Sequence, residues 1–217
     1  MISDNLKRVN SRIDSIEHNQ EVQLIAVSKT RSTAEIQEAV NAGQVHFGEN
    51  YLQESLDKIS FFKERNLIWH FIGPIQSNKT ALIAENFDWV HSVDRLKIAK
   101  RLSDQRDPGL GELNILIQIN IDQEQSKSGL LLNNVNEIIS EVNDLPNISL
   151  RGFMCIPSPK NSANSFSEMA NLISKYPFLD SLSMGMSSDL ELAIERGATL
   201  VRVGTDIFGQ RSYNQHN

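Results

Sequence analysis

The sequence of 217 residues lacks the features that mark several classes of protein. Its one cysteine, Cys155, excludes an internal disulfide and fits a reducing compartment. The formal net charge is −6 and no basic block occurs, so nothing favours binding to nucleic acid or to an anionic membrane. No run approaches the roughly 18 apolar residues of a membrane helix, and the first residues carry no apolar signal core. We therefore expect a cytoplasmic protein.

Two further absences limit the organisation of the chain and its chemistry. The five histidines show no His-x-x-x-His spacing and there is no Cys-x-x-Cys pair, so we expect no metal site. No low-complexity stretch, internal repeat or break in composition marks a domain boundary. Because 40% of the residues are hydrophobic, the chain can bury a large core, and we expect one domain over residues 1–217.

Apolar periodicity predicts the order of the elements. An amphipathic helix precedes the first strand, because Ile2, Leu6, Val9, Ile13 and Ile16 recur every three or four residues. The predicted strands are Val22–Val27, Val45–Phe47, Ile68–Ile72, Trp89–His91, Leu113–Ile119, Ile148–Met154, Ser181–Met184 and Leu200–Val203. The predicted helices between them are Thr33–Ala42, Tyr51–Arg65, Lys79–Ala84, Asp94–Asp104, Leu131–Val142, Ser165–Ser174 and Asp189–Arg196.

Strands that alternate with helices in this way predict an α/β fold with a parallel sheet. About eight strands within about 200 residues favour a TIM-like (β/α)8 barrel with an extra N-terminal helix. An open doubly wound sheet has the same local pattern and is the alternative. In a barrel, the carboxyl ends of all strands meet on one face, and residues that follow the strands would converge there.

Lys29 is the most informative residue of the sequence. It closes the apolar run that begins at Leu24, where loss of water would disfavour its charged form. A neutral amine is a nucleophile for aldehydes. The same pattern also fits a solvated lysine at the end of a strand.

The loops after the seventh and eighth predicted strands have the composition of a phosphate site. They contain Ser187-Ser188-Asp189 and Arg202-Val203-Gly204-Thr205, and Thr205–Phe208 could form a short helix. Backbone amides and a helix start point at an anion in these loops of many barrels. A lysine together with such a site favours pyridoxal phosphate. Ser187-Ser188-Asp189 also fits a simple helix cap.

Three other motifs have two readings each. Gly48-Glu49-Asn50 follows the second strand and fits either a ligand site or a helix start with Asn50 as the N-cap. His70 stands among large apolar residues and is typical of a structural core histidine rather than a catalytic one. Met184-Gly185-Met186 is consistent with core filling or with the wall of a ligand site.

Several motifs together resemble a known family. They are Ala26-Val27-Ser28-Lys29-Thr30, Phe47-Gly48-Glu49-Asn50-Tyr51, Trp69-His70-Phe71-Ile72-Gly73-Pro74-Ile75-Gln76-Ser77-Asn78-Lys79, Ser126-Lys127-Ser128-Gly129, Ser183-Met184-Gly185-Met186-Ser187-Ser188-Asp189 and Arg202-Val203-Gly204-Thr205-Asp206-Ile207-Phe208-Gly209. In this order the chain resembles the pyridoxal phosphate homeostasis proteins, which are single-domain relatives of the alanine racemase N-terminal barrel. The resemblance extends from the first strand to residue 209.

This resemblance implies a barrel that holds pyridoxal 5'-phosphate as a Schiff base on Lys29. Ser187 and the amides of Gly204 and Thr205 would hold the phosphate, and Arg202 would face the pyridine nitrogen. Asn50 would lie in the same pocket. The implied role is control of the intracellular vitamin B6 pool and of amino-acid and keto-acid balance, without strong catalysis and without a catalytic residue or a metal. PLP-dependent apoenzymes are the expected protein partners, and the chain is expected to be a monomer.

Three function classes remain to be compared: a cofactor carrier or regulator, an amino-acid racemase, and a Schiff-base lyase without the cofactor. Racemisation needs proton transfer on both faces of the substrate, and in the two-domain racemases one base comes from outside the barrel. We expect no second domain to bring that base here. A ring nitrogen beside the permanently charged Arg202 would stay unprotonated and withdraw electrons weakly. A plain lyase gives no reason for an arginine opposite the lysine, so the regulator is favoured.

Overall fold

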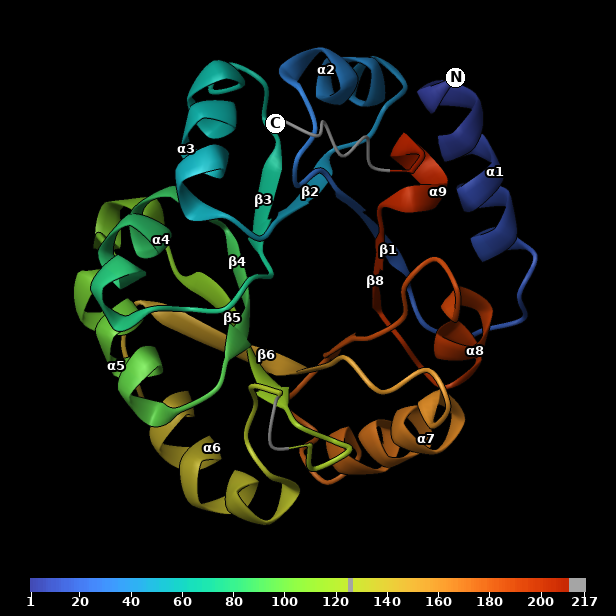
Figure 1. The fold of residues 1–217 in the computed structure, drawn as a ribbon. Coiled ribbons are helices and arrows are strands. Elements are labelled where there is room, and N and C mark those ends of the chain that lie inside the picture. Colours follow the sequence, from blue (N-terminus) through green and yellow to red (C-terminus); the bar gives the residue numbers. More distant parts are fainter. Residues whose placement is uncertain (125–126, 211–217) are drawn as a thin grey trace, which may run out of the picture.

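The computed structural model describes residues 1–124 and 127–210. Within them, eight parallel strands close into a barrel in chain order, and β8 pairs with β1 (Figure 1). The strands are β1 (Gln23–Val27), β2 (His46–Glu49), β3 (Ile68–Phe71), β4 (Trp89–Val93), β5 (Leu113–Ile119), β6 (Ile148–Cys155), β7 (Ser181–Ser183) and β8 (Leu200–Val203). The (β/α)8 prediction is confirmed, and the open doubly wound sheet is excluded. Ser126 of the Ser126–Gly129 motif lies outside the described residues.

Helices surround the barrel on its outer side (Figure 1). They are α2 (Thr33–Asn41), α3 (Leu52–Phe61), α4 (Thr80–Asn86), α5 (Leu96–Gln105), α6 (Val135–Asn143), α7 (Ser162–Ile173), α8 (Leu190–Glu195) and α9 (Thr205–Phe208). The predicted helix over 51–65 ends early, because the chain turns at Phe62, whose carbonyl accepts from the Arg65 amide at 2.9 Å. The predicted helix over 165–174 begins earlier, at Ser162. The first turn predicted over 131–142 is a 3-10 turn, Leu132–Asn134.

The predicted helix before the first strand is α1 (Ile2–Asp14). Its apolar face is buried and packs against α2, α8 and α9. The Asn5 side-chain amide also donates to the Ile207 carbonyl at 2.8 Å, which ties α1 to the helix after the last strand. The extra helix therefore covers the junction where the first and last strands meet.

The sheet separates two hydrophobic regions. Inside the barrel, Ile25, Leu116, Met154 and Leu200 form a small cluster, and Trp89 packs against it. The larger core lies between the sheet and the helices and includes Phe47, Phe153 and Phe166, all fully buried. Side chains alternate between these regions because successive residues of a strand point to opposite faces of the sheet. In the described ranges, no helix combines the length and the apolar character needed to cross a bilayer.

Candidate functional site

A cavity of about 500 Å³ opens at the carboxyl ends of the strands. It brings together all six residues that the sequence predicts for the site, from four separate loops and one strand. Its lining consists of Val27, Lys29, Asn50, Ile72, Ile156, Met186, Ser187, Ser188, Arg202, Gly204, Thr205 and Asp206. Met184 is fully buried whereas Met186 reaches the cavity, so the Met-Gly-Met motif serves both the core and the wall.

Lys29 is half-buried and lies two residues beyond β1, in a tight turn. The Arg31 amide closes this turn by donating to the Ser28 carbonyl at 3.0 Å. Thr30 has a φ of 63°, an unusual value for a residue with a branched side chain. Its amide donates to Glu54 Oε1 at 2.6 Å, which stabilises the turn from the side of α3.

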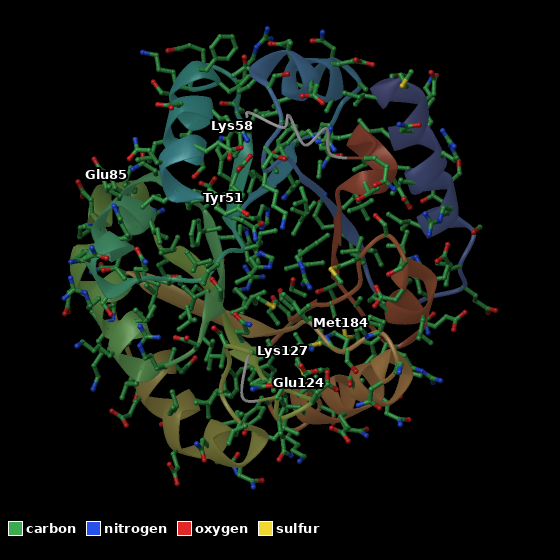
Figure 2. The ribbon with its side chains drawn as sticks, viewed as in Figure 1. Tyr51, Lys58, Glu85, Glu124, Lys127 and Met184 are labelled. Carbon is green, nitrogen blue, oxygen red and sulfur yellow. The ribbon has the colours of Figure 1, made fainter. Side chains whose placement is uncertain are left out.

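A buried ion pair between β2 and α3 stabilises the same turn. Glu49, at the end of β2, is fully buried and accepts from Ser28 Oγ at 2.6 Å and from Lys58 Nζ at 2.8 Å. Lys58, labelled in Figure 2, also donates to the Ser28 carbonyl at 2.7 Å and to Glu54. Burial raises the pKa of Glu49, although Lys58 and Ser28 oppose the rise. The Lys58 ammonium group thus bonds to Glu49 and Glu54, the two carboxylates that stabilise the Ser28–Thr30 turn.

Asn50 lies directly after Glu49 and borders the cavity. Its Oδ1 atom is buried and has no hydrogen-bond partner in the described structure. The N-cap of α3 is Tyr51 rather than Asn50, so the helix-cap reading of Asn50 is wrong. Gly73 is required beside it, because a Cβ there would lie 2.1 Å from the Asn50 carbonyl oxygen. Gly73 thus packs directly on the Asn50 backbone, and Asn50 borders the cavity.

The loops after β7 and β8 form the other side of the cavity. Gly204 is the N-cap of α9, and the first amides of a helix have no partner within it. A Cβ on Gly204 would lie 3.3 Å from the Val27 carbonyl oxygen, so a larger residue would crowd β1. Asp189 is the N-cap of α8 but makes no side-chain cap; it accepts instead from the Met186 amide at 2.7 Å. Ser187 and Thr205 both line the cavity beside the start of α9, where helix amides without an internal partner favour an anion.

Arg12 of α1 joins these two loops. Its guanidinium donates to the Ser187 carbonyl at 3.2 Å, to Glu191 at 2.7 Å and to Asp206 at 2.5 Å. The hydrogen bond from Arg12 lowers the pKa of Glu191. Sequence reasoning missed Arg12, because an arginine on the polar face of an amphipathic helix resembles any solvated residue there.

Arg202 lines the floor of the cavity and is 5% exposed. It donates to Ser183 Oγ and, at 2.9 Å, to the Cys155 carbonyl. Burial lowers its pKa from the usual arginine value, but a guanidinium remains charged near pH 7. Burial also raises the pKa of the Cys155 thiol to about 12, so this cysteine is inert.

Three histidines are connected to Arg202 through Ser183. They are His46, His70 and His91, here called the histidine column. His91 Nδ1 lies 2.8 Å from Ser183 Oγ, His91 Nε2 lies 2.9 Å from His70 Nδ1, and His70 Nε2 lies 2.9 Å from His46 Nδ1. Burial lowers the pKa of His70 and His91 well below 6.5, so both are neutral. The structural reading of His70 is confirmed. In the described ranges, no three or more His, Cys, Asp or Glu side chains are arranged so that they could hold a metal ion.

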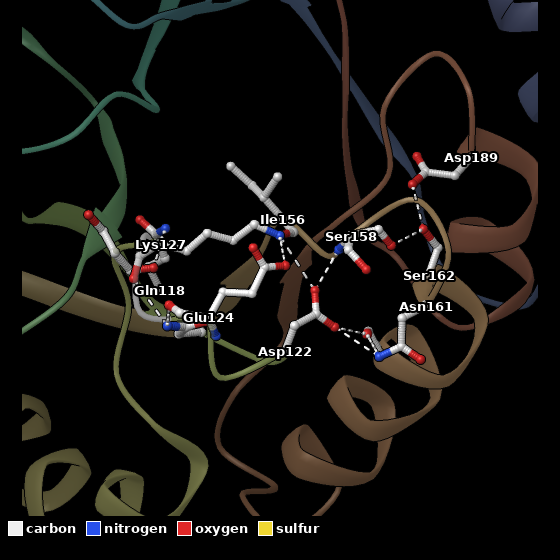
Figure 3. A network of polar contacts seen from close by, with 12 residues as sticks. Gln118, Asp122, Glu124, Lys127, Ile156, Ser158, Asn161, Ser162 and Asp189 are labelled. Carbon is white, nitrogen blue, oxygen red and sulfur yellow. Dashed lines mark hydrogen bonds and ion pairs between the residues drawn. The ribbon is translucent and has the colours of Figure 1, made fainter.

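A second polar network borders the cavity next to Ile156 (Figure 3). Asp122 accepts from Asn161 at 2.8 Å and from Ser165 at 3.0 Å, and it pairs with Lys127 at 3.5 Å. Burial raises the pKa of Asp122, but its hydrogen bonds outweigh burial and hold the pKa below its usual range. These contacts join the loops after β5 and β6.

Residues 2–212 match the family model of the alanine racemase N-terminal domain. The chain is 48% identical over 230 residues to the pyridoxal phosphate homeostasis protein of Escherichia coli K12, covering 99% of this chain and 98% of that one. It is 53% identical over 197 residues to the protein of the same name from Pseudomonas aeruginosa, covering 88% and 86%. The chain belongs to the pyridoxal phosphate homeostasis protein family.

Solved structures agree with this assignment. PipY of Synechococcus elongatus PCC7942, solved with PLP bound, has a TM-score of 0.84 and 34% identity, covering 96% of this chain and all of PipY. Alanine racemase of Clostridium difficile 630 has a TM-score of 0.72 and 15% identity, covering 97% of this chain and 58% of the racemase. The racemase likeness concerns the fold alone.

The ion pair of Glu49 predicts a large effect of substituting Lys58. Lys58→Met should lower the free energy of unfolding by about 3 kcal/mol, because it leaves the Glu49 carboxylate buried without its cation. Urea denaturation at pH 7.5 measures the loss. The Glu49→Gln and Lys58→Met double variant should recover part of the lost free energy of unfolding.

Lys63→Met is the matched control, because Lys63 and Glu64 are 4.0 Å apart and their side chains are 72% and 88% exposed. Lys63→Met should lower the free energy of unfolding by less than about 1 kcal/mol. Equal effects of Lys58→Met and Lys63→Met would contradict a supporting role for the buried pair.

Proposed function

We propose that this chain binds pyridoxal 5'-phosphate in the cavity at the carboxyl end of its barrel and acts in vitamin B6 homeostasis inside the cell. The observation that carries the proposal is the single cavity that contains Lys29, Asn50, Ser187, Arg202, Gly204 and Thr205 together. The relatives named above, and PipY with PLP bound, support it. When bound, the cofactor supplies an aldehyde that an amine can hold covalently and a ring that withdraws electrons.

The residues present fit the cofactor at each of its polar groups. Lys29 would hold the aldehyde carbon covalently, since Lys29 lines the cavity and the Thr30 amide of its turn is bonded to Glu54. Ser187 and the amides at the start of α9 would hold the phosphate, where donors face an anion. Asn50 borders the same cavity.

Arg202 would face the nitrogen of the pyridine ring. A guanidinium can only donate hydrogen bonds, so it would favour a ring nitrogen with a lone pair over a protonated one. No carboxylate forms an ion pair with Arg202 in the described structure, and its two protein partners are Ser183 and the Cys155 carbonyl. A ring kept neutral in this way would withdraw electrons weakly, which disfavours catalysis.

The racemase alternative needs an acid or base on each face of the substrate. Among the described residues that line the cavity, the ionisable side chains are Lys29, Arg202 and Asp206. Asp206 is already paired with Arg12, and Arg202 does not exchange its proton near pH 7. With Asp206 and Arg202 set aside, Lys29 is the one ionisable lining residue that remains among the described residues, so the lining supports a carrier or regulator rather than an enzyme that inverts amino acids.

The remaining features of the proposal are its setting and its partners. The proposed form is a monomer with a single barrel domain over residues 1–217, and all the described strands belong to one barrel. Cys155 is a free, buried thiol, as expected for a cytoplasmic protein. Apoenzymes that need pyridoxal phosphate are the partners that a homeostasis protein would serve.

The first test concerns covalent attachment. The purified protein with pyridoxal phosphate should absorb in the visible or near ultraviolet, and borohydride should fix the cofactor on the peptide that contains Lys29. Lys29→Ala should abolish this attachment, as peptide mass spectrometry would show. Lys79→Ala, which removes an exposed lysine of another strand-end loop, is the control and should change nothing. Recovery of the cofactor on Lys79 would refute the assignment.

The second test concerns the phosphate. The protein should bind pyridoxal phosphate far more tightly than pyridoxal, because the loops after β7 and β8 act on the anion. Arg12→Ala should weaken binding of the phosphate form about tenfold, since charge-assisted hydrogen bonds of roughly 1.5–3 kcal/mol join these loops. It should change pyridoxal binding little. Titration calorimetry with both ligands measures the difference.

Arg8→Ala is the matched control on the same helix, because Arg8 is exposed and bonds only to Asn5 in the described structure. It should leave both affinities unchanged. Equal binding of pyridoxal and its phosphate would place the cofactor site elsewhere.

The third test concerns turnover. Incubation of the loaded protein with L-alanine should give no sustained D-alanine, because the cavity offers one proton-transfer group, on one face. Chiral chromatography with Lys29→Ala as the control measures this. Lys29-dependent racemisation at a typical enzyme rate, of order 1 per second, would establish the racemase instead.

A further inference from the structure

The histidine column connects the two ends of the barrel. His46 begins β2 and is half-buried beside a cavity of about 390 Å³ at the amino-terminal rim, next to Val22 and Asp14. His70 and His91 are fully buried in the barrel interior. Through Ser183, the column ends at Arg202, which lines the proposed cofactor cavity at the opposite rim. These side chains come from five different strands.

The donor and acceptor roles along this column follow from Arg202. Its guanidinium can only donate, so Ser183 Oγ accepts from it. The hydroxyl proton of Ser183 then needs its own acceptor, and His91 Nδ1 is the acceptor 2.8 Å away. His91 Nδ1 must therefore lack a proton and Nε2 must carry one. By the same reasoning, His91 Nε2 donates to His70 Nδ1. His70 Nε2 in turn donates to His46 Nδ1.

The reverse order of protons is disfavoured for two reasons. If His91 Nδ1 donated to Ser183, the fully buried hydroxyl would accept twice, and its own proton would have no acceptor in the described structure. The N–H dipoles would also point their positive ends at the Arg202 cation. In the first order every dipole turns its negative end toward Arg202, which is the favourable direction at low dielectric.

We propose that Ser183 and the histidine column are positioning residues that orient Arg202 toward the ring nitrogen of the bound cofactor. Ser183 presents a lone pair to the guanidinium because the column takes its proton, and the Cys155 carbonyl holds the other arm at 2.9 Å. The remaining N–H groups of Arg202 are then directed at the cavity. This inference rests on the proposed function only for the identity of the ligand; the proton order is a property of the chain alone.

The proton order is measured on the protein without cofactor. Long-range proton–nitrogen NMR of the histidine rings should find His46, His70 and His91 neutral at pH 7.5, each with its proton on Nε2. Ser183→Ala removes the hydroxyl that donates to His91. The rings of His91 and His70 should then each populate a mixture of the two neutral tautomers. Ser183→Thr keeps the hydroxyl and should restore the single form. A proton on His91 Nδ1 in the unaltered chain would overturn the proposal.

Ser181→Ala is the matched control. Ser181 is a buried hydroxyl on the same strand, but it donates to Asp180 at 2.7 Å and makes no bond to Arg202 in the described structure. It should leave the histidine signals unchanged, and thermal unfolding of each variant shows whether its fold is intact. If Ser183→Ala disturbs the rings no more than Ser181→Ala does, Ser183 does not orient the column.

The second readout is the absorption band of the bound cofactor. In Ser183→Ala, a loosened Arg202 should allow the ring nitrogen to take up a proton, which shifts the band, while borohydride still fixes the cofactor on Lys29. Ser181→Ala and Ser183→Thr should keep the band of the unaltered protein. An unshifted band in Ser183→Ala would refute the positioning role. Absence of any attachment to the unaltered chain would instead refute the proposed function, while the NMR result still decides the proton order.

Discussion

The closed barrel has a small interior that side chains from every strand must fill together. In this protein, apolar residues fill only part of it: Ile25, Leu116, Met154 and Leu200 cluster there, and the remaining space holds imidazoles and a guanidinium. Most buried polar groups are hydrogen-bonded, because an unpaired one is costly. The interior therefore has to be organised as a connected polar network, and that network leads to the cavity at the carboxyl rim.

The elements outside the barrel stabilise the same rim by different means. On one side, Lys58 of α3 reaches Glu49 and the Ser28 carbonyl under the lysine turn. On the other side, Arg12 of α1 joins the loops after β7 and β8. The extra N-terminal helix is thus part of the site's support rather than an appendage. Both cations act on backbone positions, so the geometry of the cavity is determined by residues that do not line it.

Sequence periodicity was sufficient for the order of strands and helices, because most strands are short apolar runs. It did not separate a closed barrel from an open sheet, and the number of strands favoured the barrel. The residues at the cavity could be predicted because a barrel brings strand ends together, whatever their distance in sequence. The supporting contacts could not, since they depend on register and side-chain direction. His46 and His70 are 24 residues apart and His70 and His91 are 21 apart, and only the alignment of β2, β3 and β4 shows that all three point inward.

The neutral state of the buried histidines links folding to proton concentration. In the folded chain the pKa of His70 and His91 lies well below 6.5, whereas in the unfolded chain both would titrate near that value. Below about pH 6.5 the unfolded chain binds more protons, so each histidine removes up to about 1.4 kcal/mol of stability per pH unit until its folded pKa is reached. Above about pH 6.5 the contribution of the neutral histidines to stability is fully present. The barrel interior therefore makes the fold sensitive to acidification.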